Sequence, residues 1–294
     1  MNKTKKGSPL KRNAALTLGA MGVVYGDIGT SPIYAFNEAV HAGGDTRPEI
    51  LGVLSLVFWT LTIIVSIKYL IFVLNADNKG EGGTLAMFSQ FTEKIRAGRK
   101  GLMGFTVFIF LMAAALEFAD GILTPAISVT SAVEGIKTIN PELAFLVVPL
   151  TVLILAVLFI VQFKGTHKIG AIFGPVMIIW FFVIAFMGVS QVMQNPESLV
   201  ALNPIYAFSF IQAHSFQTLF VMSSVILAVT GAEALYSDLG HFGKGPIRFG
   251  WFALAGLALP LNYFGQGALL LRDPSAHGNT FFGMAGTGLP ALLL

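Results

Sequence analysis

Long apolar segments separated by short polar ones dominate the chain. Seven of them approach or exceed the about 20 residues that a helix needs to cross a bilayer. They cover residues 14–39, 50–74, 101–136, 143–163, 169–193, 217–241 and 247–271, and an eighth begins at Leu289. Transmembrane β-strands would show short segments of alternating polarity, whereas these runs are continuous. The pattern predicts an all-α membrane protein with seven spanning helices and the start of an eighth.

Composition supports this interpretation and excludes a soluble domain, a disordered chain and any site that needs cysteine. Only 11% of the 294 residues are charged and 55% are hydrophobic, whereas a soluble domain carries about 25% charged residues. Disordered chains are polar and rich in charge, so disorder is excluded as well. The chain has no Cys, which excludes disulfides, thiolate metal sites and cysteine nucleophiles.

The 18 Lys and Arg residues are distributed unevenly between the two predicted sides of the membrane. Fourteen lie in the N-terminal tail 1–13 or in the loops after spans two, four and six; three lie on the other side and Lys68 lies inside span two. Positively charged loops stay in the cytoplasm, so the N-terminus is predicted to be cytoplasmic. No basic stripe with interleaved aromatic residues is present, and nucleic acid is not an expected partner. The loop residues 80–97 read as a Gly-rich turn and an amphipathic interfacial helix.

Acidic residues inside the spans are the strongest candidates for function. A carboxylate at the bilayer centre costs at least about 2.5–3.5 kcal/mol, so such residues are rarely retained without a role. Asp27 lies in span one, Glu117 and Asp120 lie in span three, and Glu233 lies in span six. Hydroxyl residues accompany these acids, namely Thr30, Ser31, Thr124, Ser128 and Thr230. These hydroxyls either line a polar path or bond back to their own helices, and Glu117 either acts itself or holds Asp120 protonated.

Spans one and six are both interrupted by glycine beside an acid, and Pro32 adds a second helix breaker to span one. Each break alone could serve packing. The two interrupted spans are five spans apart and therefore start on opposite sides of the membrane. This is the relation expected between equivalent helices of an inverted five-helix repeat. Carboxylates, hydroxyls and freed carbonyls are hard oxygen ligands and favour a dehydrated cation. Because a carboxylate in a low-dielectric site retains its proton more readily, cation binding could be linked to protonation.

Several long motifs are shared with a known family. GVVYGDIGTSPIY (22–34) resembles the signature of the KUP/HAK/KT potassium uptake permeases. The similarity continues through residues 76–84, 121–135, 165–170, 173–177, 201–204, 230–243 and 261–271. These motifs are collinear and extend over nearly the whole chain.

The resemblance implies K+ uptake by H+ symport on the amino-acid–polyamine–organocation transporter fold, in a cell membrane and with no cofactor beyond the transported ions. By that analogy, K+ and the proton site would be surrounded by Asp27, Tyr34, Asp120, Thr124, Ser128, Thr230 and Glu233. Several family members carry Glu where this chain has Asp120, which leaves the reach of that carboxylate open.

The family has about a dozen spanning helices, so this chain would hold the first repeat, 14–193, and only the start of the second, 217–294. We therefore expect it to be a fragment, or to need a homodimer partner or a missing C-terminal half. Composition and spacing alone leave other functions open, including an inactive truncated copy, a channel-like pore and a non-transporting receptor. An intramembrane aspartyl protease would need Asp27 and Asp120 to share a proton at about 3 Å.

Overall fold

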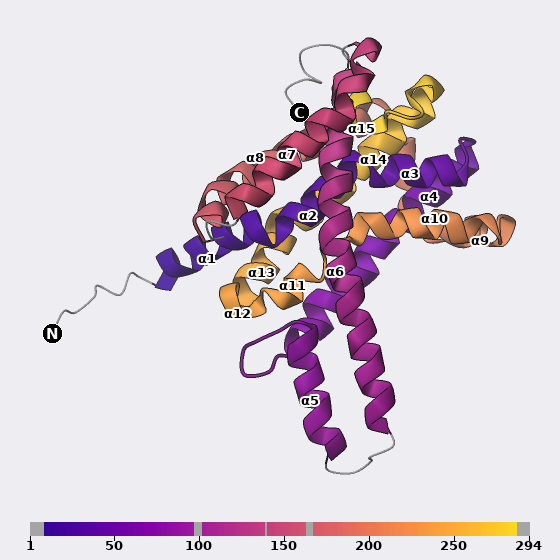
Figure 1. Cartoon of the computed structure of the whole chain (residues 1–294). Helices are drawn as coiled ribbons and strands as arrows, with labels where there is room; N and C mark the ends of the chain where they lie inside the picture. Colours follow the sequence, from indigo (N-terminus) through magenta and orange to yellow (C-terminus); the bar gives the residue numbers. More distant parts are fainter. Residues whose placement is uncertain (1–8, 97–101, 139, 163–166, 287–294) are drawn as a thin grey trace.

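The computed structural model describes residues 9–96, 102–138, 140–162 and 167–286 (Figure 1). The helices are α1 (Pro9–Val23), α2 (Tyr25–Thr30), α3 (Ala35–Gly43), α4 (Arg47–Thr60), α5 (Thr84–Arg96), α6 (Leu102–Glu134), α7 (Val147–Gln162), α8 (His167–Gln194), α9 (Ile205–Ala213), α10 (Gln217–Ile226), α11 (Ala234–Ser237), α12 (Leu239–Phe242), α13 (Lys244–Gly250), α14 (Gly256–Arg272) and α15 (Thr280–Gly283). Extended pairing within these ranges is limited to one bridge between Asn78 and Glu81. The prediction of an all-α fold is confirmed.

Among the described residues, six helical segments are long and apolar enough to cross a membrane. They are Arg47–Asn75, Gly104–Thr138, Pro141–Ile160, Phe173–Gln194, Gln217–Ser237 and Lys244–Arg272. Each coincides with one of the predicted spans two to seven, with ends shifted by a few residues. The predicted start of an eighth span lies outside the described residues, so the full helix count stays a prediction.

The first predicted span, 14–39, is helical but divided. The helix α1 ends at Val23, α2 follows, and a short 3-10 turn at Ser31–Ile33 separates α2 from α3. Asp27 is therefore on α2, and the interruption begins one turn later than the glycines suggested. Span three behaves differently, because α6 is continuous through Pro125. Proline is tolerated in membrane helices when hydroxyls and neighbouring helices satisfy the freed backbone groups.

Two connections carry more structure than a loop. The predicted amphipathic helix is present as α5, which runs alongside α6 with Phe88 and Phe91 against Phe110 (Figure 1). Between spans five and six, a 3-10 segment at Pro196–Leu202 leads into α9. Sequence reasoning left this stretch as a connection, although it is largely apolar.

The main core lies where α14 and α1 cross α8 and where α3 packs on α10. Gly188 of α8 and Gly265 of α14 face each other so closely that a Cβ added to Gly265 would lie 2.4 Å from the Gly188 Cα. Small residues at crossings let membrane helices approach at backbone distance. The large side chains Tyr25, Phe36, Phe181 and Tyr263 are fully buried in this core.

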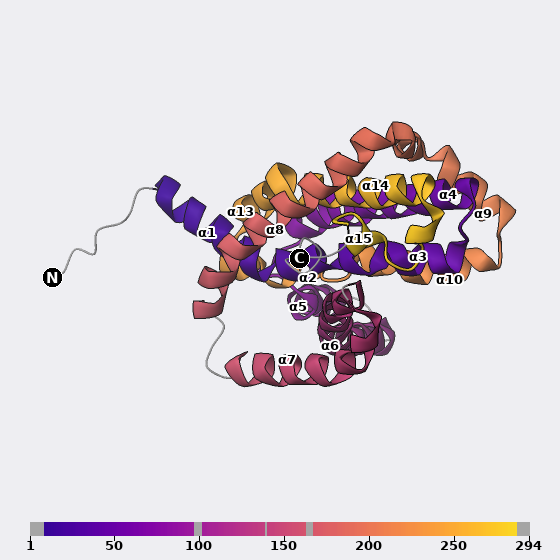
Figure 2. The same ribbon diagram turned by 90° about the horizontal axis from the view of Figure 1, so that it is seen from above.

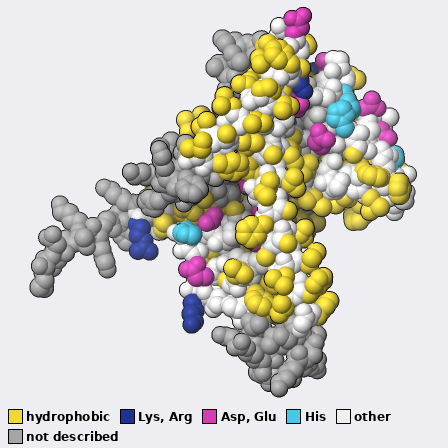
Figure 3. Space-filling view, viewed as in Figure 1, with side chains coloured by type: hydrophobic (Ala, Val, Ile, Leu, Met, Phe, Trp, Pro, Cys, Tyr) yellow, Lys and Arg dark blue, Asp and Glu magenta, His cyan; other side chains and the backbone are white. Residues whose placement is uncertain are grey.

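Helices α6 and α7 lie to one side of that core (Figure 2). Hydrophobic side chains dominate the face shown in Figure 3. The exposed hydrophobic residues of α6 and α7 include Leu116, Phe118, Val148 and Ile160, and Phe118 is 77% exposed. Apolar groups on this scale are expected on surfaces that meet lipid or other membrane helices.

Candidate ion-binding site

The interruptions in spans one and six are in direct contact. After Val229 the chain of span six leaves the helix, with Thr230 extended (φ −58°, ψ 147°) and Gly231 at φ +80°. A Cβ built on Gly231 would lie 2.4 Å from the Asp27 Cβ and 3.1 Å from the Ile28 backbone nitrogen. The residue that lets span six turn is therefore also the one that lets it approach the acid of span one.

Three of the predicted acids gather around this contact. The carboxyl groups of Asp27 and Asp120 interact electrostatically, and Glu233 interacts with both of them. Each of the three residues is partly buried. They come from α2, α6 and the turn before α11, so the site joins spans one, three and six. Asp120 and Glu233 interact most directly, because their side chains lie within hydrogen-bonding reach of each other.

Hydroxyl groups extend the polar site along α6. Thr124 donates a hydrogen bond to Asp120 Oδ1 at 2.9 Å. The Thr30 hydroxyl donates to the Asp27 carbonyl at 2.9 Å, so Ser128 donates in the 3.0 Å contact between the Ser128 and Thr30 hydroxyls. Thr124 and Ser128 are both buried. These contacts place two groups of hydrogen-bonded oxygen atoms along α6, and the one at Ser128 joins it to span one.

Two other predicted residues have different surroundings. The Thr230 hydroxyl donates to the Leu227 carbonyl at 2.9 Å, so in this conformation it bonds back to its own segment. Tyr34 is buried and lines a cavity of about 350 Å³, together with Glu38, His41 and Glu134. This Tyr34 cavity lies on the predicted outer side of the first break, apart from the three acids.

A second cavity reaches the site from the predicted cytoplasmic side. It has a volume of about 320 Å³ and is lined by Glu117, Glu233, Lys68, Tyr69 and other residues of spans two, three and six. Glu117 accepts a hydrogen bond from the Thr84 hydroxyl at 2.8 Å, so it faces this Glu233 cavity and not the contact between the breaks. Glu233 lies where the cavity meets the cluster of acids.

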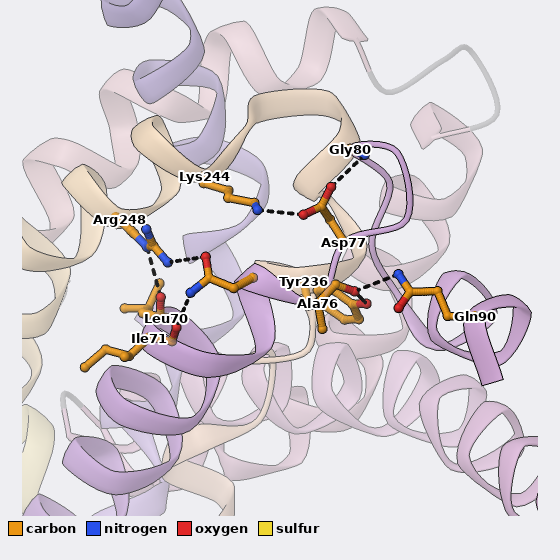
Figure 4. Close-up of polar contacts among 10 residues, drawn as sticks. Leu70, Ile71, Ala76, Asp77, Gly80, Gln90, Tyr236, Lys244 and Arg248 are labelled. Atoms are coloured by element: carbon orange, nitrogen blue, oxygen red, sulfur yellow. Dashed lines mark hydrogen bonds and ion pairs between the residues drawn. The ribbon is translucent and has the colours of Figure 1, made fainter. Parts of the chain in front are cut away.

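Polar contacts join the ends of spans two, six and seven that are predicted to be cytoplasmic (Figure 4). The Tyr236 hydroxyl donates to the Ala76 carbonyl at 2.7 Å, and Lys244 donates to Asp77 Oδ1 at 2.6 Å. The Arg248 guanidinium donates to the Leu70 carbonyl at 2.9 Å. Because Lys244 and a backbone amide both bond to it, the pKa of the Asp77 carboxyl is held below its usual range. We refer to these contacts as the inner clamp.

Sequence reasoning missed two residues that contact the first break. Trp180 of α8 donates its indole N–H to the Gly29 carbonyl at 2.8 Å, and Gln266 of α14 donates its amide to the Pro32 carbonyl at 2.8 Å. A signal for the second was present: Asn262 and Gln266 are amides four positions apart in an apolar span, and so lie on one helical face. For Trp180 the sequence offered no signal, because an apolar span often carries tryptophan.

These features define a class of membrane protein. Broken helices whose interruptions meet inside the protein, with acids and hydroxyls around them, are the arrangement in which multi-pass transporters bind ions and substrates. A family model described as the K+ potassium transporter integral membrane domain matches residues 14–294. The chain belongs to this potassium transporter family, which is a family of transporters and not of enzymes.

The chain is similar to curated potassium transport proteins over nearly its whole length. The chain is 50% identical to the probable potassium transport system protein Kup 1 of Rhodopseudomonas palustris (strain BisB18) over 92% of its own length and 44% of that protein. It is 53% identical to the probable potassium transport system protein Kup 2 of Mesorhizobium japonicum, over 92% of its own length and 42% of that protein. The chain thus spans less than half the length of these relatives. No solved structure matches it.

Proposed function

We propose that the protein takes part in K+ uptake by H+ symport across the cell membrane, as a secondary active transporter with a cytoplasmic N-terminus. The observation that carries this proposal is the contact of Gly231 with Asp27, with Asp120 and Glu233 beside it. It is supported by relatives that are named as potassium transport system proteins. The contact between the two breaks also favours the inverted five-helix repeat, in which spans one and six occupy equivalent positions.

The chemistry of the site suits a monovalent hard cation. Carboxylate and hydroxyl oxygens of Asp27, Thr124, Ser128 and Glu233 can replace the water around K+. Asp120 completes the acidic part of this set, while Tyr34 and Thr230 would join after a change of conformation.

Coupling to protons follows from the crowding of the carboxylates. When all three are ionised they repel one another, and a proton on one carboxyl removes part of that repulsion while leaving two carboxylates for K+. The cluster can therefore hold a proton and K+ together, as symport requires. Entry from the Tyr34 cavity and release into the Glu233 cavity give the expected direction of movement.

The test expresses the gene that encodes this chain in a bacterial host that lacks its own K+ uptake systems. We expect growth at limiting K+ and uptake that is stimulated by external acid, both lost in Asp27→Asn and in Glu233→Gln. Asp45→Asn and Glu142→Gln are matched controls, because both residues are exposed and lie outside the site. Unchanged uptake in both site variants would remove the carboxylate mechanism. Uptake that ignores the proton gradient would instead indicate channel-like conduction.

Binding of K+ to the purified 294-residue chain provides a second measurement that does not require the whole length of the relatives. Calorimetry in detergent should show K+ binding to the chain and none to Asp27→Asn. A chain that neither binds K+ nor supports growth would contradict the proposal.

A further inference from the structure

The first break creates a backbone problem that other spans must solve. The 3-10 turn Ser31–Ile33 interrupts the regular hydrogen-bond ladder, and Ser31 and Pro32 are buried. A backbone carbonyl that loses its partner within a membrane protein must find another donor there. The Ser31 carbonyl accepts from the Tyr34 amide at 3.2 Å, whereas the Pro32 carbonyl depends on a side chain.

That side chain is Gln266, which is 1% exposed. Its amide nitrogen donates to the Pro32 carbonyl at 2.8 Å and to Asn262 Oδ1 at 2.9 Å. Its oxygen accepts from the Thr280 hydroxyl at 2.6 Å. Asn262 in turn donates to the Ile184 carbonyl at 3.0 Å. Both hydrogens and the oxygen of the Gln266 amide are therefore occupied, which fixes its orientation.

Pro32 is two residues before Tyr34, which is one of the residues that line the Tyr34 cavity. Tyr34 sits at φ −130° at the end of the turn, and its hydroxyl group interacts electrostatically with that of Tyr263. Tyr263 is on α14, three positions before Gln266 and thus on a neighbouring part of the same helical face. Residues of α14 therefore interact both with the turn and with Tyr34.

We propose that Gln266 is a positioning residue for the ion site, which holds the first break in its unwound form through the Pro32 carbonyl. It does not contact the ion; it sets where Tyr34 and the end of α2 lie. Trp180 supports the other end of the same segment through the Gly29 carbonyl. This inference rests on the proposed function for its transport readout, but the positioning itself can be measured separately.

The first experiment compares Gln266→Met with Gln191→Met. Gln191 is also a buried glutamine, and its amide donates at 3.1 Å to the Met284 carbonyl, away from the break. Gln266→Met leaves the Pro32 carbonyl unpaired, so the KM for K+ should rise about tenfold, the effect of one buried hydrogen bond, with a smaller change in maximal rate. Gln191→Met should leave that KM unchanged even if it lowers thermal stability.

The second experiment measures the break directly. Hydrogen–deuterium exchange of the purified chain should be faster at residues 25–36 in Gln266→Met and unchanged there in Gln191→Met. Gln266→Glu adds a rescue test: its carboxyl can donate to the Pro32 carbonyl only when protonated, so its KM, relative to the parent protein at the same pH, should recover toward acid pH.

Equal exchange at residues 25–36 in the parent protein and Gln266→Met would overturn the positioning role, whatever the transport result. Altered exchange with an unchanged KM would show that the break is held but that the ion does not depend on it, which also overturns the proposal. If the parent protein takes up no K+, the proposed function fails, while exchange still decides whether Gln266 holds the break.

Discussion

Replacing Gly231 by Ala tests whether the approach of spans one and six is as close as described. Two separate effects act at this position. A side chain at φ +80° is strained by roughly 1–2 kcal/mol. The added Cβ would also lie 2.4 Å from the Asp27 Cβ, so Asp27 must retreat by about 1 Å to reach an ordinary contact. Overpacking of this kind typically adds about 1–3 kcal/mol.

Gly243 provides a matched control for the first effect. It has the same φ of +80°, but a Cβ there would meet nothing within 4 Å. Gly243→Ala should therefore show the conformational strain alone. We expect Gly231→Ala to be less stable than Gly243→Ala by about 1–3 kcal/mol, which is the contribution of the contact with Asp27.

Thermal unfolding of the purified chain in detergent measures this difference, and K+ uptake measures its effect on function. Because a displacement of about 1 Å can lower a rate by two orders of magnitude, Gly231→Ala should abolish uptake while Gly243→Ala retains it. The double variant Gly231→Ala with Asp27→Gly removes the opposing Cβ and should recover stability, as a double-mutant cycle requires for residues in contact. Equal stability of the two alanine variants, or no recovery in the double variant, would refute the contact.

Three further predictions concern other contacts. Trp180→Phe removes the donor to the first break and should raise the KM for K+ about three- to tenfold. Trp59→Phe removes a similar indole bond, which goes to the Leu202 carbonyl and not to the break, and should leave that KM unchanged; equal effects would contradict the assignment. Asp77→Asn should lower thermal stability slightly. Because the pKa of Asp77 is lower in the folded than in the unfolded protein, this loss should be constant above about pH 4 and vanish as pH falls through the folded-state value; a loss that grows toward acid pH would reverse the sign. Tyr263→Phe removes a buried hydroxyl with no hydrogen-bond partner among the described residues, so the melting temperature should stay equal or rise, and a clear fall would show that the hydroxyl is paired.

Much of the fold was predictable because the apolar runs are long and the breaks carry glycine and proline. Spans two to seven were placed within a few residues. The exact position of the first break was not predictable, because Gly26 and Gly29 remain helical while the turn forms at Ser31. Glycine weakens a helix but does not end it, and tertiary contacts decide where the ladder opens.

The sequence singled out the acids that the structure brings together, but it did not show their arrangement or that Tyr34 lies apart from them. Intramembrane acids are expensive to bury, which singled out Asp27, Asp120 and Glu233. Their mutual approach depends on the close contact at Gly231, and no spacing along the chain encodes that. Gln266 could have been singled out by Asn262 four positions before it, but its bond to the first break could not, because a backbone carbonyl leaves no mark in the sequence.

Because the inner clamp joins the ends of spans two, six and seven, a rearrangement near the second break has to move these ends together or break the clamp. Separating α11 from span two would remove the bond between Tyr236 and the Ala76 carbonyl, and separating α13 would remove those of Arg248 and Lys244. The loop that follows span two is further joined to α6 through Thr84 and Glu117. A rotation at Gly231 would accordingly move α11 and α13 together with the end of span two. A movement at the candidate ion site would therefore also displace the part of α6 that contacts this group, and would not be confined to one short helix.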